Sequence, residues 1–137
     1  MKDFRPVLLI EDNPTDAKII KQAYASLKIR NKLIHVTNSE EALSYLRNNR
    51  NKKPCVIILD LNLPKTDGVN FLHAVKHDKN LKQMPVVILT TSSQEQDVAK
   101  GFELGVAGYI LKPSSYEEYV EKLQTIQLYW SLSELPV

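Results

Sequence analysis

The sequence predicts an α/β fold in which five parallel strands form one sheet with helices on both faces. Short apolar runs recur at intervals of 23 to 30 residues, which leaves room for a strand, a helix and two turns. Most of these runs are rich in Val and Ile, as expected for strands that are covered on both faces. Apolar residues recur at helical spacing between them. The five expected strands are Val7–Ile10, Leu33–Val36, Val56–Leu59, Val86–Leu89 and Tyr109–Leu111.

Residues that can cap a helix follow four of these strands. Asn13 is the expected cap of the first helix, with Asp16 three residues later as its partner. Pro14 follows Asn13 and suits the first helical position because no amide hydrogen is needed there. Asn38, Ser93 and Ser114 are each followed three residues later by Glu or Gln, which is the pattern of a capping box. Five β-α units therefore account for nearly the whole chain.

The composition fits one cytoplasmic domain that spans residues 1–137. A net charge of +2 is too mild to indicate nucleic acid, and the basic run Arg47–Lys53 is interpreted as a solvated loop. Cys55 has no second cysteine within these residues to form a disulfide, which favours a reducing compartment. The chain contains no apolar stretch of the roughly 18 residues that would suggest a membrane span.

Polar residues follow the ends of four expected strands. Glu11 and Asp12 follow the first strand, Asp60 the third, Thr90 the fourth and Lys112 the fifth. Each residue alone could be a turn, a cap or solvated surface. The carboxyl ends of parallel strands, however, meet at one edge of the sheet, where such folds bind ligands. Together, these residues predict a functional site at that edge.

The charges at this edge indicate a metal ion and phosphate chemistry. Converging carboxylates repel one another by on the order of 4 kcal/mol per close pair, which a bound cation relieves. Oxygen ligands favour Mg²⁺, or Mn²⁺, over Zn²⁺. We expect Asp60 to act as a nucleophile that accepts a phosphoryl group. Lys112 would then neutralise phosphoryl charge, and the Thr90 hydroxyl would bind a phosphoryl oxygen.

These residues resemble the motifs of response-regulator receiver domains from two-component signalling. The resemblance runs from about Phe4 to Leu128, and residues 129–137 form a short C-terminal extension. It implies a flavodoxin-like fold, a (βα)5 three-layer sandwich with strand order 2-1-3-4-5. The matching segments are Leu9–Asp12, Leu59–Pro64 with Asp67–Gly68 behind it, Leu89–Ser92 and Tyr109–Pro113.

The resemblance also implies how the site works. Mg²⁺ would be bound by the side chains of Asp12 and Asp60 and the backbone carbonyl of Asn62, while Glu11 would act through a metal-bound water. The phosphoryl group would come from a sensor histidine kinase or from a small donor such as acetyl phosphate. The domain would not be an enzyme in the ordinary sense, because it would catalyse only its own phosphotransfer and dephosphorylation.

Further residues take their expected roles from the same resemblance. Phosphorylation would draw Thr90 inward and rotate Tyr109, which together form the switch. The bond between Lys112 and Pro113 would be a cis peptide. Asn62 and Ser92 would flank the water that removes the phosphate, and neither is a strong base.

Part of the sequence is similar to single-domain receivers that are paired with bacterial phytochrome kinases. The similar segments are Thr90–Ser93 and the ending from Ile126 to Pro136. We expect self-association or partner docking through the fourth helix, the fifth strand and the fifth helix. Aromatic residues are frequent interface anchors, and Tyr116, Tyr119, Tyr129 and Trp130 crowd near this end. The alternative is that Tyr119 belongs to the core and that Trp130 folds back over the domain.

Three other functions remain open from the sequence. The chain could be a receiver-like interaction module that takes no phosphate. It could be a phosphatase that uses Asp60 as nucleophile, although Asn62 breaks the Asp-x-Asp pattern of such enzymes. It could bind a flavin, although the acidic loop Glu11–Asp16 would repel the flavin phosphate. The histidines His35, His73 and His77 are expected to lie away from the strand ends, in structural or surface roles.

Overall fold

Five parallel strands form one sheet in the order β2-β1-β3-β4-β5. The structure is a computed structural model, and it describes residues 5–64 and 67–134. Strands and helices alternate along the chain, which confirms the predicted fold class. The elements are β1 (Val7–Ile10), α1 (Pro14–Ser26), β2 (Leu33–Val36), α2 (Ser39–Asn48), β3 (Val56–Leu59), α3 (Asp67–Lys76), β4 (Val86–Thr90), α4 (Glu95–Glu103), β5 (Gly108–Leu111) and α5 (Tyr116–Leu132).

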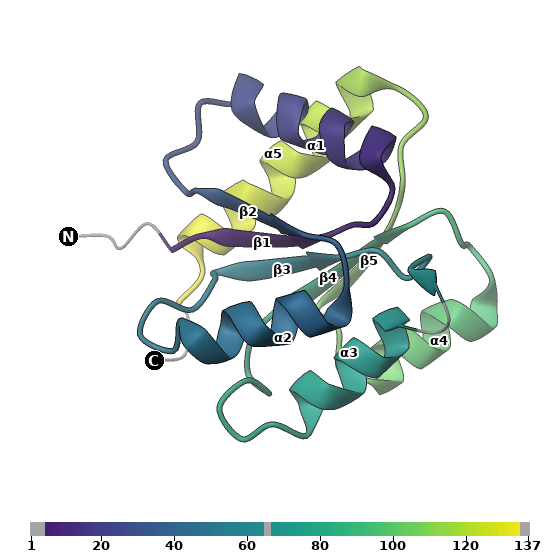
Figure 1. The fold of residues 1–137 in the computed structure, drawn as a ribbon. Coiled ribbons are helices and arrows are strands. Elements are labelled where there is room, and N and C mark those ends of the chain that lie inside the picture. Colours follow the sequence, from purple (N-terminus) through teal and green to yellow (C-terminus); the bar gives the residue numbers. More distant parts are fainter. Residues whose placement is uncertain (1–4, 65–66, 135–137) are drawn as a thin grey trace.

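The helices form two layers around the sheet. Figure 1 shows α1 and α5 on one face and α2, α3 and α4 on the other. The three central strands are buried along their whole length, and alternate residues enter opposite layers of the core. In β1, for example, Leu8 and Ile10 pack toward α2 and α3, whereas Val7 and Leu9 pack toward α1 and α5. The unbroken apolar runs in the sequence therefore reflect burial on both faces.

Two helices begin at their predicted caps, and two others begin one residue later than predicted. The Asn13 side chain accepts a hydrogen bond from the Asp16 amide, and Asn38 caps α2 through the Glu41 amide. At α5 the cap is Ser115 instead of Ser114. At α4 the cap position is Gln94, which makes no side-chain capping bond, so the predicted cap at Ser93 is wrong.

Helix α5 continues into the predicted C-terminal extension. It ends at Leu132, so the first residues after 128 are helical, while Leu135–Pro136 lies outside the described residues. Tyr119 is buried in the core, and Trp130 is partly buried and packs against the same cluster. Tyr129, beside it, remains 62% exposed. The aromatic residues of α5 are thus divided between the core and the surface.

Within the described ranges, each helix is too short or too polar to cross a bilayer.

Candidate functional site

Neighbouring strands bring the predicted carboxylates together. Ile10 and Leu59 are partners in the β1–β3 register, so the residues that follow them, Glu11 and Asp60, lie side by side. The Asp60 amide donates to the Ile10 carbonyl at 3.1 Å, which extends the ladder to the acid itself. Carboxylate oxygens of Glu11, Asp12 and Asp60 all lie within 4.8 Å of one another. The structure therefore brings together the acidic cluster that the sequence predicted.

Lys112 enters this cluster from the end of β5. Its backbone amide donates to the Thr90 carbonyl at 2.7 Å, which fixes where the side chain starts. Its ammonium lies 2.8 Å from Glu11 Oε1, 2.7 Å from Asp16 Oδ2 and 2.9 Å from Asp60 Oδ2. The Lys112 side chain is only 5% exposed. All three ammonium hydrogens can thus be directed at carboxylates, which suits a buried cation.

Burial and mutual contacts shift two pKa values in the cluster. Burial, followed by a hydrogen bond with the Asp60 carboxyl, raises the pKa of Glu11 from 4.5 to about 7, although Lys112 opposes the shift. Burial alone would lower the pKa of Lys112. Its hydrogen bonds to Asp16, Glu11 and Asp60 outweigh that effect and raise its pKa above the ordinary value. Lys112 therefore stays charged near neutral pH, whereas Glu11, with a pKa of about 7, is partly protonated there when no metal ion is present.

The residues predicted to surround Asp60 lie at the same edge. Thr90 is fully buried at the end of β4. The Asn62 amide donates to Asp60 Oδ1 at 2.9 Å, and its side chain donates to Thr91 Oγ1 at 2.6 Å. The Ser92 hydroxyl donates to Asp97 in the first turn of α4. Two loops therefore border the acceptor, and each is held by a side-chain hydrogen bond.

Tyr109 connects strand β5 to one of these loops. Its hydroxyl donates to the Ser92 carbonyl at 2.8 Å, and its ring is partly buried against the core. A rotation of this ring would break the bond to the β4–α4 loop. The expected switch residue is thus in direct contact with the loop that follows Thr90.

The expected cis peptide is not found. The Lys112–Pro113 bond is trans, and no peptide bond among residues 5–64 and 67–134 is cis. Trans is the lower-energy form before proline by about 0.5–1 kcal/mol. The Lys112 ammonium reaches its three carboxylates from this trans bond. The resemblance was therefore misleading on this detail.

Gly68 allows α3 to pack directly behind the acceptor. A Cβ at this position would lie 3.2 Å from the Asp60 carbonyl oxygen and 3.3 Å from Leu61 Cα. Both are backbone atoms, which cannot move aside as the end of a flexible side chain can. The preceding residue, Asp67, accepts a hydrogen bond from the Ser39 amide at 2.7 Å and so connects α3 to the start of α2.

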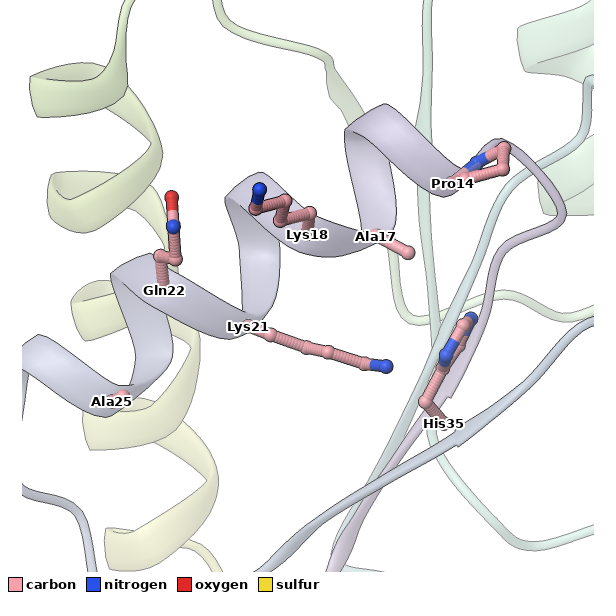
Figure 2. Close-up of a pocket in the computed structure, with 7 residues that line it drawn as sticks. All are labelled: Pro14, Ala17, Lys18, Lys21, Gln22, Ala25 and His35. Atoms are coloured by element: carbon pink, nitrogen blue, oxygen red, sulfur yellow. The ribbon is translucent and has the colours of Figure 1, made fainter.

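Sequence reasoning missed two features of the site. Asp16 was interpreted only as a partner of the Asn13 cap, but its side chain also forms an ion pair with Lys112. His35 does not lie away from the strand ends, because its Nε2 donates to the Glu11 carbonyl at 2.8 Å. It also borders a hollow between α1 and β2, where Figure 2 shows Lys21 reaching from α1 toward the histidine. The role of His35 at this point is structural, as expected.

The donor set of the cluster fits a hard divalent cation. Glu11, Asp12 and Asp60 offer only carboxylate oxygens, the ligands that Mg²⁺ and Mn²⁺ prefer. Burial first, and then contact with the Asp60 carboxyl, raise the pKa of Glu11, and a cation bound beside these oxygens would favour the charged form. A cation is thus the natural complement of this site.

The fold and the site define a signalling domain of a known class. A family model described as the response regulator receiver domain matches residues 7–124. The chain therefore belongs to the response-regulator receiver family. Within that family, response regulator Rcp1 of Synechocystis sp. is 34% identical over 128 residues, covering 90% of this chain and 87% of its own length.

Solved structures of similar proteins agree with this assignment. The phosphorylated cyanobacterial phytochrome response regulator RcpA is 35% identical, with a TM-score of 0.88 over 98% of this chain and 100% of its own. The Mn²⁺-bound form of response regulator Rcp1 is 33% identical, with a TM-score of 0.83 over 97% of this chain and 99% of its own. The acidic cluster of this chain fits the phosphorylation site of a receiver and the binding of a divalent cation.

Proposed function

We propose that Asp60 is the phosphate acceptor of this receiver and that its phosphorylation, with Mg²⁺ bound, switches protein contacts. The observation that carries this proposal is the surroundings of Asp60. Its carboxylate is buried, 2.9 Å from the Lys112 ammonium and within 4.8 Å of oxygens from Glu11 and Asp12. Asp12, Asp60 and the Asn62 carbonyl are the proposed Mg²⁺ ligands, with Glu11 acting through a bound water.

The chemistry follows from the position of each group. A carboxylate oxygen of Asp60 attacks the phosphorus atom of the donor, and the bond from phosphorus to the leaving group breaks. A divalent cation would supply positive charge close to the phosphoryl oxygens. Lys112 is positioned to move its ammonium from the Asp60 carboxylate to a phosphoryl oxygen. The buried Thr90 hydroxyl lies at the same edge and would donate to another phosphoryl oxygen.

We assign the donor to a sensor histidine kinase of the phytochrome type, acting in the cytoplasm. Support comes from the similar protein described as a cyanobacterial phytochrome response regulator, which matches nearly the whole chain. The reaction is then the chain's own phosphotransfer and dephosphorylation, with no separate substrate to turn over. Residues 1–137 would work as a single receiver domain.

The proposed output passes through Thr90, Tyr109 and the β4–α4 loop. If Thr90 moves toward a phosphoryl group, the space beside it changes and the Tyr109 ring can rotate inward. The hydrogen bond from Tyr109 to the Ser92 carbonyl would then be lost, which frees the loop before α4. The surface formed by α4, β5 and α5 would therefore differ between the two states.

This surface has apolar residues that suit a second copy of the chain or a protein partner. Phe102 of α4 is 52% exposed, Leu111 of β5 is 42% exposed and Tyr129 of α5 is 62% exposed. Tyr129 lies two helical turns from Lys122, which donates to the Leu111 carbonyl, so both face β5. We name Phe102, Leu111 and Tyr129 the output face. Tyr116 does not belong to it, because its hydroxyl points to the Gln22 carbonyl of α1.

Phosphorylation by a small donor tests this function. Intact mass would be measured after incubation with acetyl phosphate, with Mg²⁺ and with EDTA, for the wild type and for Asp60→Asn. We expect one phosphoryl group on the wild type in Mg²⁺ and none in the other samples. A receiver-like module without phosphate would stay unmodified throughout. Equal modification of Asp60→Asn, or undiminished reaction in EDTA, would contradict the proposal.

A further inference from the structure

Two histidines form a pair at the C-terminal end of α3. His73 lies in the last turn of α3, and His77 immediately follows the helix end, four residues later. Residues four apart on a helix project from the same side. Both side chains are exposed, and their rings are stacked with centroids 6.1 Å apart and an interplanar angle of 24°. Nothing in the phosphorylation chemistry uses this pair.

The hydrogen bonding of His77 prepares it to bind a metal ion. Its Nδ1 lies 2.8 Å from the His73 carbonyl oxygen. A carbonyl oxygen only accepts, so Nδ1 donates, and the neutral ring has its lone pair on Nε2. A histidine that binds a metal commonly donates its other ring nitrogen to a backbone carbonyl in this way, which fixes both tautomer and orientation. Nε2 of His77 is therefore available as a ligand.

The helix end and the hydrogen bonds of neighbouring charged residues allow a cation to bind at this pair. The site lies at the C-terminal end of α3, where unpaired carbonyls make the helix end partly negative. The ammonium of Lys76, the residue before His77, donates to the Glu103 carbonyl at 2.8 Å. Asp78 is already engaged with the Asn80 amide and lies 4.0 Å from Arg47. The pair would thus supply two nitrogen ligands, and water would complete the coordination.

We propose that His73 and His77 together bind one transition-metal ion of the Cu²⁺, Ni²⁺ and Zn²⁺ class. Two imidazoles at this spacing occur on one helix face in metal-binding motifs. Rotation of the His73 ring about χ2, which has broad minima, brings its nitrogen toward the same ion. Imidazole ligands select against Mg²⁺ and Mn²⁺, and the general order of affinity places Cu²⁺ above Ni²⁺ and Zn²⁺. The site is therefore chemically distinct from the oxygen cluster at Asp60.

Nickel titration of the intact chain tests this site. Calorimetry would be run in excess Mg²⁺, which occupies the acidic cluster, on the wild type, His73→Gln, His77→Gln and the double variant. His35→Gln is the matched control, because it removes the third histidine of the chain. We expect one Ni²⁺ per wild-type chain, binding at least about tenfold weaker in each single variant, and unchanged binding in His35→Gln. Cu²⁺ should bind more tightly, with two imidazole nitrogens visible by electron paramagnetic resonance.

Several outcomes would overturn the proposal. These are no Ni²⁺ binding by the wild type, wild-type affinity in the double variant, loss in only one single variant, or displacement of Ni²⁺ by Mg²⁺. Thermal melting without metal provides the folding control. The His73 and His77 side chains are exposed, so the variants at these two positions should melt as the wild type does. Acetyl phosphate labelling of Asp60 should also be unchanged in the His73 and His77 variants, so a failure here is distinguishable from a failure of the proposed acceptor.

Discussion

The ammonium of Lys112 lies 2.9 Å from the Asp60 carboxylate, although the two residues are 52 positions apart in the chain. The same ammonium contacts Glu11 and Asp16, so one cation holds three carboxylates before any phosphate arrives. Lys112 therefore has two roles in this account. It stabilises the resting site, and it is already next to the atom that is proposed to accept the phosphoryl group.

Replacing Lys112 by glutamine should destabilise the domain in the absence of metal. The three carboxylates would lose their common partner in a buried site, which typically costs about 3–5 kcal/mol. Urea unfolding at pH 7 in EDTA measures this loss. Lys122→Gln is the matched control, because its ammonium donates to the Leu111 carbonyl at an exposed position. Equal stability of the two variants would mean that the Lys112 contacts are not important for folding.

The raised pKa of Glu11 predicts that stability falls between about pH 5 and pH 7 when no divalent cation is present. The folded state keeps its proton up to about pH 7, whereas the unfolded chain releases it near 4.5. The folded state thus binds more protons in this window, so the free energy of unfolding decreases as pH rises, by on the order of 3 kcal/mol.

Urea unfolding from pH 4.5 to 8 in EDTA checks this dependence. Glu11→Gln should remove most of the decrease, because glutamine carries no titrating proton. Added Mg²⁺ should flatten the wild-type curve, since a cation stabilises the charged cluster. A wild-type curve that rises through this range in EDTA would show that Glu11 is ionised in the folded state.

Gly68→Ala should impair both stability and phosphorylation. Its Cβ would press on the backbone of Asp60 and Leu61, and such crowding typically costs about 1–3 kcal/mol. Gly108→Ala is the control, since the nearest atoms to a Cβ there are Val87 side-chain carbons at 3.9 Å. Thermal melts and acetyl phosphate labelling should separate the two variants. Normal labelling of Gly68→Ala would show that the acceptor loop tolerates displacement.

Self-association should depend on the output face. Tyr129→Ala should weaken dimerisation by more than about 1 kcal/mol, roughly fivefold or more, because exposed aromatic residues are common interface anchors. Tyr116→Ala serves as the control, because that ring faces α1. Light scattering with and without beryllofluoride measures the effect. A wild type that stays monomeric under both conditions rules out self-association and leaves partner docking.

The sequence predicted the strands well and the helix starts less well. Buried parallel strands give continuous apolar runs, and all five were located to within a residue or two. Helix starts depend on a few hydrogen bonds in the loops. Two adjacent serines precede each of the helices α4 and α5, and the sequence does not show which of the two, if either, caps the helix. At α5 the structure uses Ser115 in place of Ser114. At α4 the cap position is Gln94, and the Ser92 hydroxyl instead donates to Asp97 in the first turn.

The sequence predicted those residues of the site that directly follow a strand. Glu11, Asp60 and Lys112 follow apolar runs, so the parallel order alone brings them to one edge. The ion pair between Asp16 and Lys112 was missed because the predicted cap with Asn13 already accounted for an acidic residue at position 16. His35 was missed because the sequence gives the face of β2 but not how far its ring reaches toward β1. Contacts that depend on sheet twist and side-chain reach have no periodic signal in the sequence.

Locating the phosphoryl group on the chain tests the assignment of Asp60 as acceptor most directly. An acyl phosphate is reduced by borohydride, which converts the modified aspartate to homoserine, and tandem mass spectrometry then identifies the position. The wild type would be treated with acetyl phosphate and Mg²⁺ before reduction. We expect homoserine at position 60 and at no other aspartate. Homoserine at Asp12 or Asp16, or its absence from a sample whose intact mass shows phosphate, would contradict Asp60 as the acceptor.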